Sequence, residues 1–388
     1  LTLYMITSVV GDNPGLGWDE AFALSTYSWY TMLVYVMSIP GGILADKFIG
    51  QKKAVMLGGF ILVAGHGILA VEAIWAFYLG LALIILGVGC LKPNISTMVG
   101  GLYPGKDPRR DQGFTIFYIG INIGAFLSAL IVGFIGEKYG WHYGFGLAGI
   151  GMAIGQVVFI LGQKYLQGVG EAPGKGKIFG QGEEEKDSSL GRLFASLLGS
   201  PLQLGITLAL GALAILLSWN LSSGGERIAW SALGVFLALI FGMLSMVYQE
   251  IGKVEKDRFV VLLLSFLIVT VFWGAYEQAG GLMNIYTLQK IDRVVDMLSL
   301  DILFFGASAL LLVKGGADFL RGRDTRYIFL PLAIMLPALY LWLRSTELAD
   351  PYEIPAAVFQ SLSALYIIII GAGVGSFWVW WRRKGRES

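Results

Sequence analysis

The sequence contains very little cysteine, histidine and charge. Cys90 is the single cysteine, which excludes a disulfide framework and a cysteine-based metal site. His66 and His142 are the only histidines, and no phosphate-binding loop or pairing of a nucleophile with a base is found. Charged residues make up 14% of the 388 positions, whereas soluble domains contain about 25%. We therefore expect neither an ordinary soluble protein nor an enzyme, and no metal or organic cofactor.

Apolar residues, glycine and aromatic residues are abundant instead. The chain is 56% hydrophobic with a mean hydropathy of +0.69, and it contains 54 glycines. Glycine lets transmembrane helices pack closely, and aromatic residues anchor them at the headgroups. The 28 basic residues nearly balance the 27 acidic ones, so nucleic acid is not an expected partner. The composition predicts an all-α polytopic protein in a lipid bilayer.

Long apolar runs divide the chain into candidate spans, each of which needs about 20 mostly apolar residues. After the tail of a helix at 1–11, we predict spans at 21–45, 54–71, 75–98, 113–136, 142–163, 203–221, 229–248, 259–283 and 355–381. The shorter runs 301–313 and 326–343 fit either a helical hairpin or a re-entrant or interfacial segment. No signal peptide is visible, and the start at Leu1 without an initiator Met leads us to expect the middle of a longer protein.

Basic residues gather in alternate loops, which the positive-inside rule assigns to the cytoplasm. Those loops contain Lys47, Lys52 and Lys53; then Lys106, Arg109 and Arg110; then the polar linker; and finally the cluster Arg382–Arg386. If 301–313 and 326–343 form a hairpin, its tip at 321–326 is cytoplasmic as well. The predicted organisation is a helix bundle at 1–166, a cytoplasmic linker at 167–202, two extra transmembrane helices at 203–250, and at 251–388 the start of a second bundle with an unusual insertion at 299–344.

Lys92 is the sharpest functional candidate. It lies inside an apolar span, directly before Pro93 and Asn94. An ammonium group within the membrane normally faces a partner or a wet cavity, and Pro93 frees a backbone carbonyl that also suits a cavity wall. The functional interpretation is a cation that receives a carboxylate. The alternative is a lysine that snorkels to the interface.

Glu277 is the candidate acidic counterpart. It lies late in the span 259–283, four residues after Trp273, so that both occupy one helical face. An apolar aromatic wall favours the neutral form of a carboxyl group, which can then exchange a proton in a useful pH range. The alternative places Glu277 at the membrane surface, solvated.

Three further features carry polar groups into the predicted bundle. Asn122 lies in mid-span, four residues after Tyr118, and can bind a ligand or join two helices. Tyr35 is a lone phenol in an apolar span, either a ligand contact or a packing residue. The segment Gly41–Lys53 contains Asp46, Lys47 and Gly50, and forms either a conformational hinge or only a basic loop that sets topology.

Together these motifs resemble the proton-dependent oligopeptide transporter (POT) family of the major facilitator superfamily. The similarity covers roughly 1–290 and 355–388, and it rests on Gly41–Lys53, Gly89–Gly100, Asp111 with Phe114–Ala125, Trp141–Phe145, Phe272–Gln278 and Phe359–Leu362. The resemblance implies a major facilitator helix bundle of twelve core helices, with two more between the halves in bacterial members. It also implies alternating access in the bacterial inner membrane, with di- and tripeptides carried inward alongside protons.

The resemblance also implies roles for individual residues. Lys92 is expected to hold the peptide carboxylate, Asn122 its amino end or backbone, and Glu277 to take part in proton coupling, while Tyr35 and Trp273 line the cavity. Ser363 stands where the family usually has asparagine, which weakens hydrogen bonding to the peptide amine. The family's first-helix acidic motif and its last four helices are absent from the sequence, and 299–344 has no counterpart in the family core.

Other functions remain open from the sequence. A relative that moves another small anion or zwitterion, such as nitrate or a drug-like molecule, has the same general features. A transport-inactive binding or scaffold protein is the other alternative, with 299–344 making partner contacts. Lys92 and Glu277 argue against it, since intramembrane charges are costly to keep without a use.

Overall fold

The computed structural model describes residues 1–103, 107, 109–166, 168–172, 196–224, 226–321, 326–346, 351–368, 370, 377 and 381. Within these residues, nine helices are long and apolar enough to cross a membrane. The prediction of an all-α polytopic membrane protein is confirmed. The chain forms two compact units, one of residues 1–180 with 278–388 and the other of residues 181–277. Most of the predicted linker 167–202, and the cluster Arg382–Arg386, lie outside the described residues.

In the first unit, the predicted span 21–45 is a helical run with an interruption. α1 (Thr2–Ile6) precedes α2 (Glu20–Val36), which the Asp19 carboxylate caps by accepting from the Ala21 N–H at 3.0 Å. α3 (Ser38–Leu44) and a π-helical turn, η1 (Ala45–Ile49), continue the same run. Pro40 has no N–H for the Val36 carbonyl, which explains why α2 ends at Val36.

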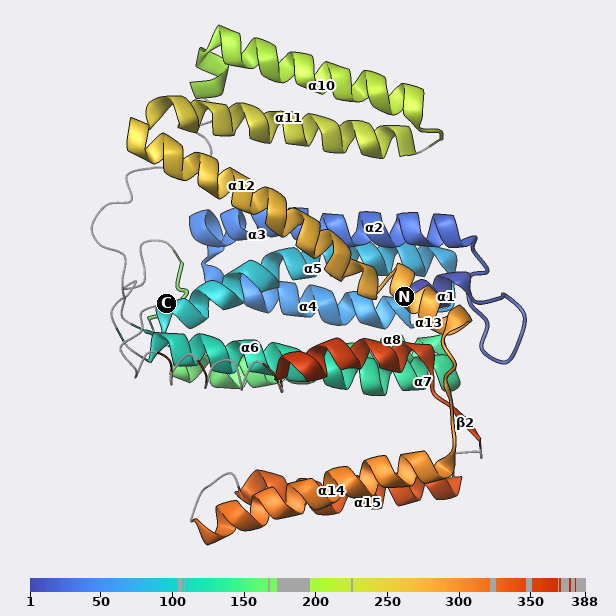
Figure 1. Ribbon diagram of the computed structural model, residues 1–388. Coiled ribbons are helices and arrows are strands. Elements are labelled where there is room, and N and C mark those ends of the chain that lie inside the picture. The colour runs from blue at the N-terminus through green and yellow to red at the C-terminus, as the bar shows by residue number, and fades with distance from the viewer. Residues whose placement is uncertain are drawn as a thin grey trace. The chain divides into compact units, whose positions relative to one another are not determined.

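α4 (Gln51–Leu69) and α5 (Ile74–Gly101) form the most extensive helix–helix contact of this unit and lie side by side in Figure 1. Glycines bring the two backbones together: a Cβ on Gly58 would lie 2.6 Å from the Gly87 carbonyl oxygen. Large apolar side chains fill the space around this seam, among them Leu62, Phe77 and Ile84. The core of the unit therefore lies between α4 and α5, close to the segment that contains Lys92.

The next spans follow the predictions at 113–136 and 142–163. α6 (Arg110–Leu127), the π-helical η2 (Ser128–Gly133) and α7 (Phe134–Lys138) form one continuous run. Gly140, at φ +147°, makes the turn into α8 (Trp141–Gly162), and the short 3-10 helix η3 (Gln163–Tyr165) follows. α8 packs along α4, and its Gln156 side chain donates to the Met56 carbonyl at 3.0 Å.

The second unit contains the two extra helices predicted at 203–250 and the helix after them. α10 (Pro201–Leu221) and α11 (Glu226–Glu250) form a hairpin (Figure 1), in which the Ser245 hydroxyl donates to the Gln203 side chain at 2.9 Å. α12 (Lys253–Tyr276) begins six residues before the predicted span because Glu255 caps its charged first turn. Its α-helical part ends at Tyr276 rather than at 283.

A 3-10 turn, η4 (Glu277–Ala279), follows α12, and the chain returns to the first unit at Gln278. α13 (Leu282–Lys290) is a separate helix after Gly280 and Gly281, so the predicted span 259–283 was too long at this end. Two-residue strands follow, β1 (Val294–Val295) and β2 (Tyr352–Glu353), which pair antiparallel with Val294 opposite Glu353. We call this strand pair the neck.

Between the two strands of the neck, the chain forms a helical hairpin. It consists of α14 (Met297–Leu320) and α15 (Arg326–Thr346), which pack against each other (Figure 1). The chain has the hairpin arrangement here, and α14, with 24 residues, extends beyond both ends of the predicted run 301–313. The predicted apolar run stops at 313 because Lys314 is charged. The Lys314 ammonium pairs with the Asp318 carboxylate one turn later, at 2.5 Å, so the helix continues through both charges.

After the neck, the 3-10 helix η5 (Ala356–Gln360) leads into a helical segment described as far as 368. This segment is the start of the span predicted at 355–381. Beyond 368 only residues 370, 377 and 381 are described, so the length of that span lies outside the described residues.

Candidate functional site

Lys92 on α5 and Tyr35 on α2 meet in the first unit. The Lys92 Nζ lies 4.2 Å from the centroid of the Tyr35 ring, a cation–π contact. Both side chains are exposed, and no carboxylate among the described residues forms an ion pair with Lys92. An ammonium group has three N–H donors, and a ring on one side of it leaves the donors on the other sides available. The arrangement therefore offers a positive charge that can bind an anionic group.

Asn122 is buried on α6, but its amide nitrogen is used within its own helix. It is 7% exposed and donates to the Tyr118 carbonyl at 2.8 Å. This bond between residues four apart agrees with the predicted position of Tyr118 and Asn122 on one helical face. No hydrogen bond, ion pair or ring contact joins Asn122 to Lys92 in the described residues. The structure thus keeps the Asn122 side-chain oxygen as the group that can accept from a ligand.

Ser363 lies in the helical segment after η5 and is half-buried. Its hydroxyl donates to the Gln360 carbonyl at 3.1 Å, three residues earlier. Both lone pairs of a hydroxyl can accept while its proton is donated, so this serine offers an acceptor and no further donor. Its proposed part in binding an amine stays a prediction.

Trp273 and Glu277 belong to the second unit. Trp273 is half-exposed and packs edge-on against Phe272 and Tyr276, with ring centroids 5.6 and 5.2 Å apart. Glu277 is half-buried and is the C-cap residue that follows α12, four residues after Trp273. An aromatic cluster at the end of α12 therefore directly precedes the carboxyl group of Glu277. The proton-coupling role of Glu277 stays a prediction.

Asp46, Lys47 and Gly50 lie where η1 gives way to α4. The Gly50 N–H closes the π-helical turn on the Ala45 carbonyl at 2.9 Å, and Gly50 has φ +82°. A Cβ on Gly50 would lie 2.6 Å from the Ala172 backbone nitrogen, so both the backbone conformation and the space require glycine. Asp46 accepts from the Gln51 side chain at 3.4 Å, and Lys47 is exposed. Gly50 is thus the position of the predicted hinge segment that must be glycine.

The same loop contacts the chain that follows α8. The Lys52 N–H donates to the Gly170 carbonyl at 2.9 Å, and the Lys52 ammonium pairs with Glu171. At the opposite end of α4 and α8, Glu72 pairs with His142 at 2.6 Å. These contacts hold both ends of the α4–α8 pair.

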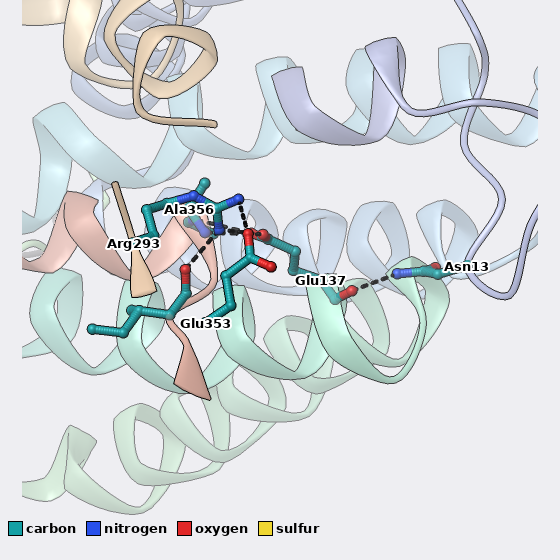
Figure 2. Close-up of polar contacts among 7 residues, drawn as sticks. Asn13, Glu137, Arg293, Glu353 and Ala356 are labelled. Atoms are coloured by element: carbon teal, nitrogen blue, oxygen red, sulfur yellow. Dashed lines mark hydrogen bonds and ion pairs between the residues drawn. The ribbon is translucent and has the colours of Figure 1, made fainter. Parts of the chain in front are cut away.

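A polar network that sequence reasoning missed surrounds Glu137, at the same end of the unit as His142. The Glu137 carboxylate accepts from the Ala356 and Ala357 N–H groups at 2.9 and 3.0 Å, at the start of η5. Arg293 lies 3.8 Å from the same carboxylate and 2.5 Å from Glu353 of the neck. Figure 2 shows these side chains converging. The network joins α7 to the neck and to η5.

Asn13 extends this network to the loop before α2 (Figure 2). Its amide nitrogen donates to the Gly136 and Glu137 carbonyls at 2.8 and 2.9 Å, and its oxygen accepts from the Trp141 N–H at 3.1 Å. Its partners lie more than 120 residues away in the sequence, so no local pattern could have identified this contact.

Asn94 is the second residue that sequence reasoning missed as a separate feature. It follows Pro93 on α5, is 2% exposed, and donates to the Gly41 carbonyl of α3 at 3.3 Å and to the Cys90 carbonyl at 2.7 Å. A buried amide directly after an intrahelical proline was the available signal, since such a group needs hydrogen-bond partners.

Comparison with known proteins gives consistent matches. The model of the POT family matches residues 52–313. The uncharacterized transporter YclF of Bacillus subtilis is 36% identical over 297 residues, 75% of this chain and 56% of that protein. A di-/tripeptide transporter of Lactococcus lactis subsp. cremoris is 32% identical over 292 residues, 74% of this chain and 56% of that protein. The chain thus spans little more than half the length of these curated relatives.

Solved structures match over nearly the whole chain. A crystal structure of a peptide transporter in complex with sulfate has a TM-score of 0.65 at 30% identity, and the match covers 98% of this chain and 64% of that one. A transporter of the same family, in complex with a thioalcohol-conjugated peptide, has a TM-score of 0.65 at 26% identity over 99% of this chain and 66% of that one. These structures confirm the predicted helix-bundle fold.

Proposed function

The chain belongs to the POT family, and from this premise we propose that its protein is a proton-coupled symporter that imports di- and tripeptides by alternating access. It is a multi-pass membrane protein of a transporter family rather than an enzyme. The single observation that carries the proposal is the Lys92 ammonium on the Tyr35 ring, a cation within an apolar span with its donors available to an anion. The bacterial relatives favour the bacterial inner membrane as its location.

A short peptide is a zwitterion, and each of its ends needs a different partner. Lys92 receives the carboxylate, while the Asn122 oxygen and Ser363 face the amino end or the backbone. Tyr35, whose ring lies under the Lys92 ammonium, lines the space for a side chain, and Trp273 takes the same role on its own helix, α12. Each of these groups lies in or beside an apolar span, where the lower local dielectric strengthens a polar contact with substrate relative to bulk water.

Glu277 supplies the coupling to protons. A carboxyl group that gains a proton when peptide binds changes peptide affinity, and peptide changes its proton affinity by the same factor. One positive charge that moves inward gains about 2.3 kcal/mol per 100 mV of membrane potential. That amount supports accumulation of peptide against a gradient.

The test is uptake of labelled dialanine into liposomes that contain the full-length protein, with and without an inward proton gradient. We expect accumulation that requires the gradient and that the Lys92→Ala substitution abolishes. Glu277→Gln is expected to abolish proton-driven accumulation while it preserves exchange of peptide across the membrane. If Glu277→Gln still concentrates peptide, the coupling assignment is wrong.

Transport of another small anion or zwitterion is the second candidate. The Lys92 site recognises negative charge rather than a peptide bond, and one similar transporter was crystallised with sulfate. Folded protein that shows no dialanine uptake, but a proton flux with nitrate or a drug-like zwitterion, would favour this function instead.

A further inference from the structure

The contact between α3 and α5 is made at an unusual place, where α5 contains a proline. Pro93 has no N–H to give to the Gly89 carbonyl four residues earlier. Gly41 of α3 packs directly against that carbonyl group, so that any side chain on Gly41 would overlap it. Conversely, a Cβ on Gly89 would lie 2.6 Å from the Met37 carbonyl oxygen. The two backbones thus touch at the turn that Pro93 opens.

Asn94 joins the helices across this same contact. Its side chain is 2% exposed, and its amide nitrogen donates to Gly41 in the opposing helix at 3.3 Å. The second bond of that nitrogen, to the Cys90 carbonyl at 2.7 Å, keeps the side chain against its own helix. A leucine has a similar volume but no donor, so it would leave the Gly41 carbonyl without this bond.

The contact lies within two turns of each residue of the candidate site, on the same two helical runs. α2 and α3 form one helical run, and Tyr35 precedes Gly41 by six residues in it. Lys92 precedes Asn94 by two residues on α5. Any slide or rotation of α3 against α5 therefore changes the position of the Tyr35 ring relative to the Lys92 ammonium, which lies 4.2 Å from its centroid.

We propose that Asn94 is a positioning residue for the anion site. Its bond to Gly41 fixes the register of α3 against α5 and so keeps the Lys92 ammonium over the Tyr35 ring, with its donors directed to substrate. Asn94 itself does not touch substrate. The effect on substrate rests on the proposed function, whereas the effect on the α3–α5 contact does not depend on it.

Two substitutions of Asn94 distinguish its two hydrogen bonds, and a third substitution, at Thr97, is the control. Asn94→Leu removes both of them. Asn94→Ser preserves a hydroxyl that can donate to the Cys90 carbonyl, as Thr97 donates to the carbonyl of Pro93 four residues earlier, but a serine is too short to reach Gly41. Thr97→Val is the matched control, because it removes an exposed bond within α5 and leaves the α3–α5 contact intact.

The first measurement is the KM and kcat of dialanine uptake by the full-length protein in liposomes, corrected for the amount of folded protein. We expect Asn94→Leu and Asn94→Ser to raise KM about tenfold with kcat changed by less than about twofold, because the loss is one of substrate binding. Thr97→Val is expected to leave both constants unchanged.

The second measurement needs no substrate. Cys90 is half-buried beside the contact and is the only cysteine of the sequence, so its rate of modification by a maleimide reports on the α3–α5 contact. Any cysteine elsewhere in the full-length protein is replaced by serine. We expect the rate to rise about tenfold in Asn94→Leu and Asn94→Ser and to stay constant in Thr97→Val, in proportion to opening of the contact.

The outcomes separate this inference from the proposed function. Parent protein that takes up no dialanine, with faster Cys90 modification in the Asn94 variants, would contradict peptide transport and support Asn94 as the residue that holds α3 to α5. Normal dialanine uptake with unchanged KM and unchanged Cys90 modification in folded Asn94→Leu would overturn the role of Asn94. A loss of folded protein alone, with an unchanged KM per folded molecule, would show Asn94 to be structural and would also overturn it.

Discussion

The α4–α5 pair and the α14–α15 pair are both antiparallel helix pairs from consecutive segments, but they are held together by different means. Between α4 and α5, glycines such as Gly58 and Gly87 let the backbones touch. Between α14 and α15, Asp301 accepts from the Tyr340 hydroxyl at 2.7 Å and pairs with Arg344. Phe304 stacks on the ring of Tyr340, with centroids 4.4 Å apart and an interplanar angle of 7°.

The difference shows two solutions to one physical problem. Helices in lipid gain little from burying apolar surface against each other, so association depends on close van der Waals packing or on polar bonds. A glycine contact depends on the absence of a side chain, which lets the two backbones approach closely, and adding a methyl group breaks it. A polar contact depends on matched partners and is broken by removing one of them.

The largest effect is expected from a methyl group in the glycine contact. Gly58→Ala places its Cβ 2.6 Å from the Gly87 carbonyl oxygen and 2.8 Å from the Leu91 nitrogen, so α4 and α5 must separate. Overpacking of this kind costs about 1–3 kcal/mol. The measurement is the thermal unfolding midpoint of the detergent-solubilised protein.

Gly67→Ala is the matched control on the same helix. A Cβ at Gly67 meets no atom within 4 Å, and alanine favours a helix over glycine by about 1 kcal/mol. It should leave the midpoint unchanged or raise it. Equal shifts for Gly58→Ala and Gly67→Ala would show that the glycine contact does not hold α4 and α5 together.

Removal of one polar partner tests the hairpin. Asp301→Ala takes the acceptor from the Tyr340 hydroxyl, and Tyr340 is 0% exposed. An unsatisfied buried hydroxyl costs about 1–3 kcal/mol, which we expect as a loss of stability of the hairpin, measured by protease cleavage within 297–346.

A double-mutant cycle identifies the cause. Tyr340→Phe should destabilise the parent protein, but it should restore part of the loss in the Asp301→Ala background, because no hydroxyl is then left without a partner. Additive losses in the two variants would mean that the bond between Asp301 and Tyr340 does not hold the hairpin.

Glu137 joins the bundle to the neck of the hairpin, and its substitution tests whether the two regions are connected there. Glu137→Gln replaces one acceptor oxygen by an amide that faces the Ala356 and Ala357 donors. Hydrogen bonds to a charged group contribute about 1.5–3 kcal/mol. We therefore expect faster hydrogen–deuterium exchange at residues 356 and 357.

Glu353→Gln is the control for this prediction. Glu353 pairs with the same Arg293, but its side chain is 63% exposed, and exposed ion pairs contribute about 0–1 kcal/mol. Exchange at 356 and 357 should be nearly unchanged. A larger change for Glu353→Gln than for Glu137→Gln would place the connection at the neck itself rather than at the carboxylate of α7.

The same contrast explains what could be predicted from the sequence. Apolar length located α4, α5, α10 and α11 within a few residues, because a span in lipid has a fixed minimum length. It misjudged α14, since Lys314 and Asp318 neutralise each other one turn apart and let the helix continue through two charges.

In the candidate site, too, the residues could be predicted from the sequence but their contacts could not. Lys92 was predicted because an intramembrane charge is costly wherever it lies, and Tyr35 was named beside it on separate grounds. The contact between them, and the bonds of Asn94, depend on how α2, α3 and α5 pack, which no local pattern contains. Glu137 and its partners in η5 are 219 and 220 residues apart, beyond any spacing rule.

The smallest effect is expected at the base of the hairpin, where Asp296 caps α14. Its carboxylate accepts from the Ser299 N–H at 2.7 Å and from the Ser299 hydroxyl at 2.8 Å, and these bonds lower the pKa of Asp296. A lowered pKa in the folded state means that the stabilisation is present above the unfolded pKa, about 3.9, and is lost as pH falls through the folded value. Asp296→Asn should therefore lower the unfolding midpoint slightly at neutral pH, and the difference from the parent should shrink as pH falls below about 4. A difference that is constant from neutral pH down to the acid limit of the fold would show that the Asp296 cap acts through its shape rather than its charge.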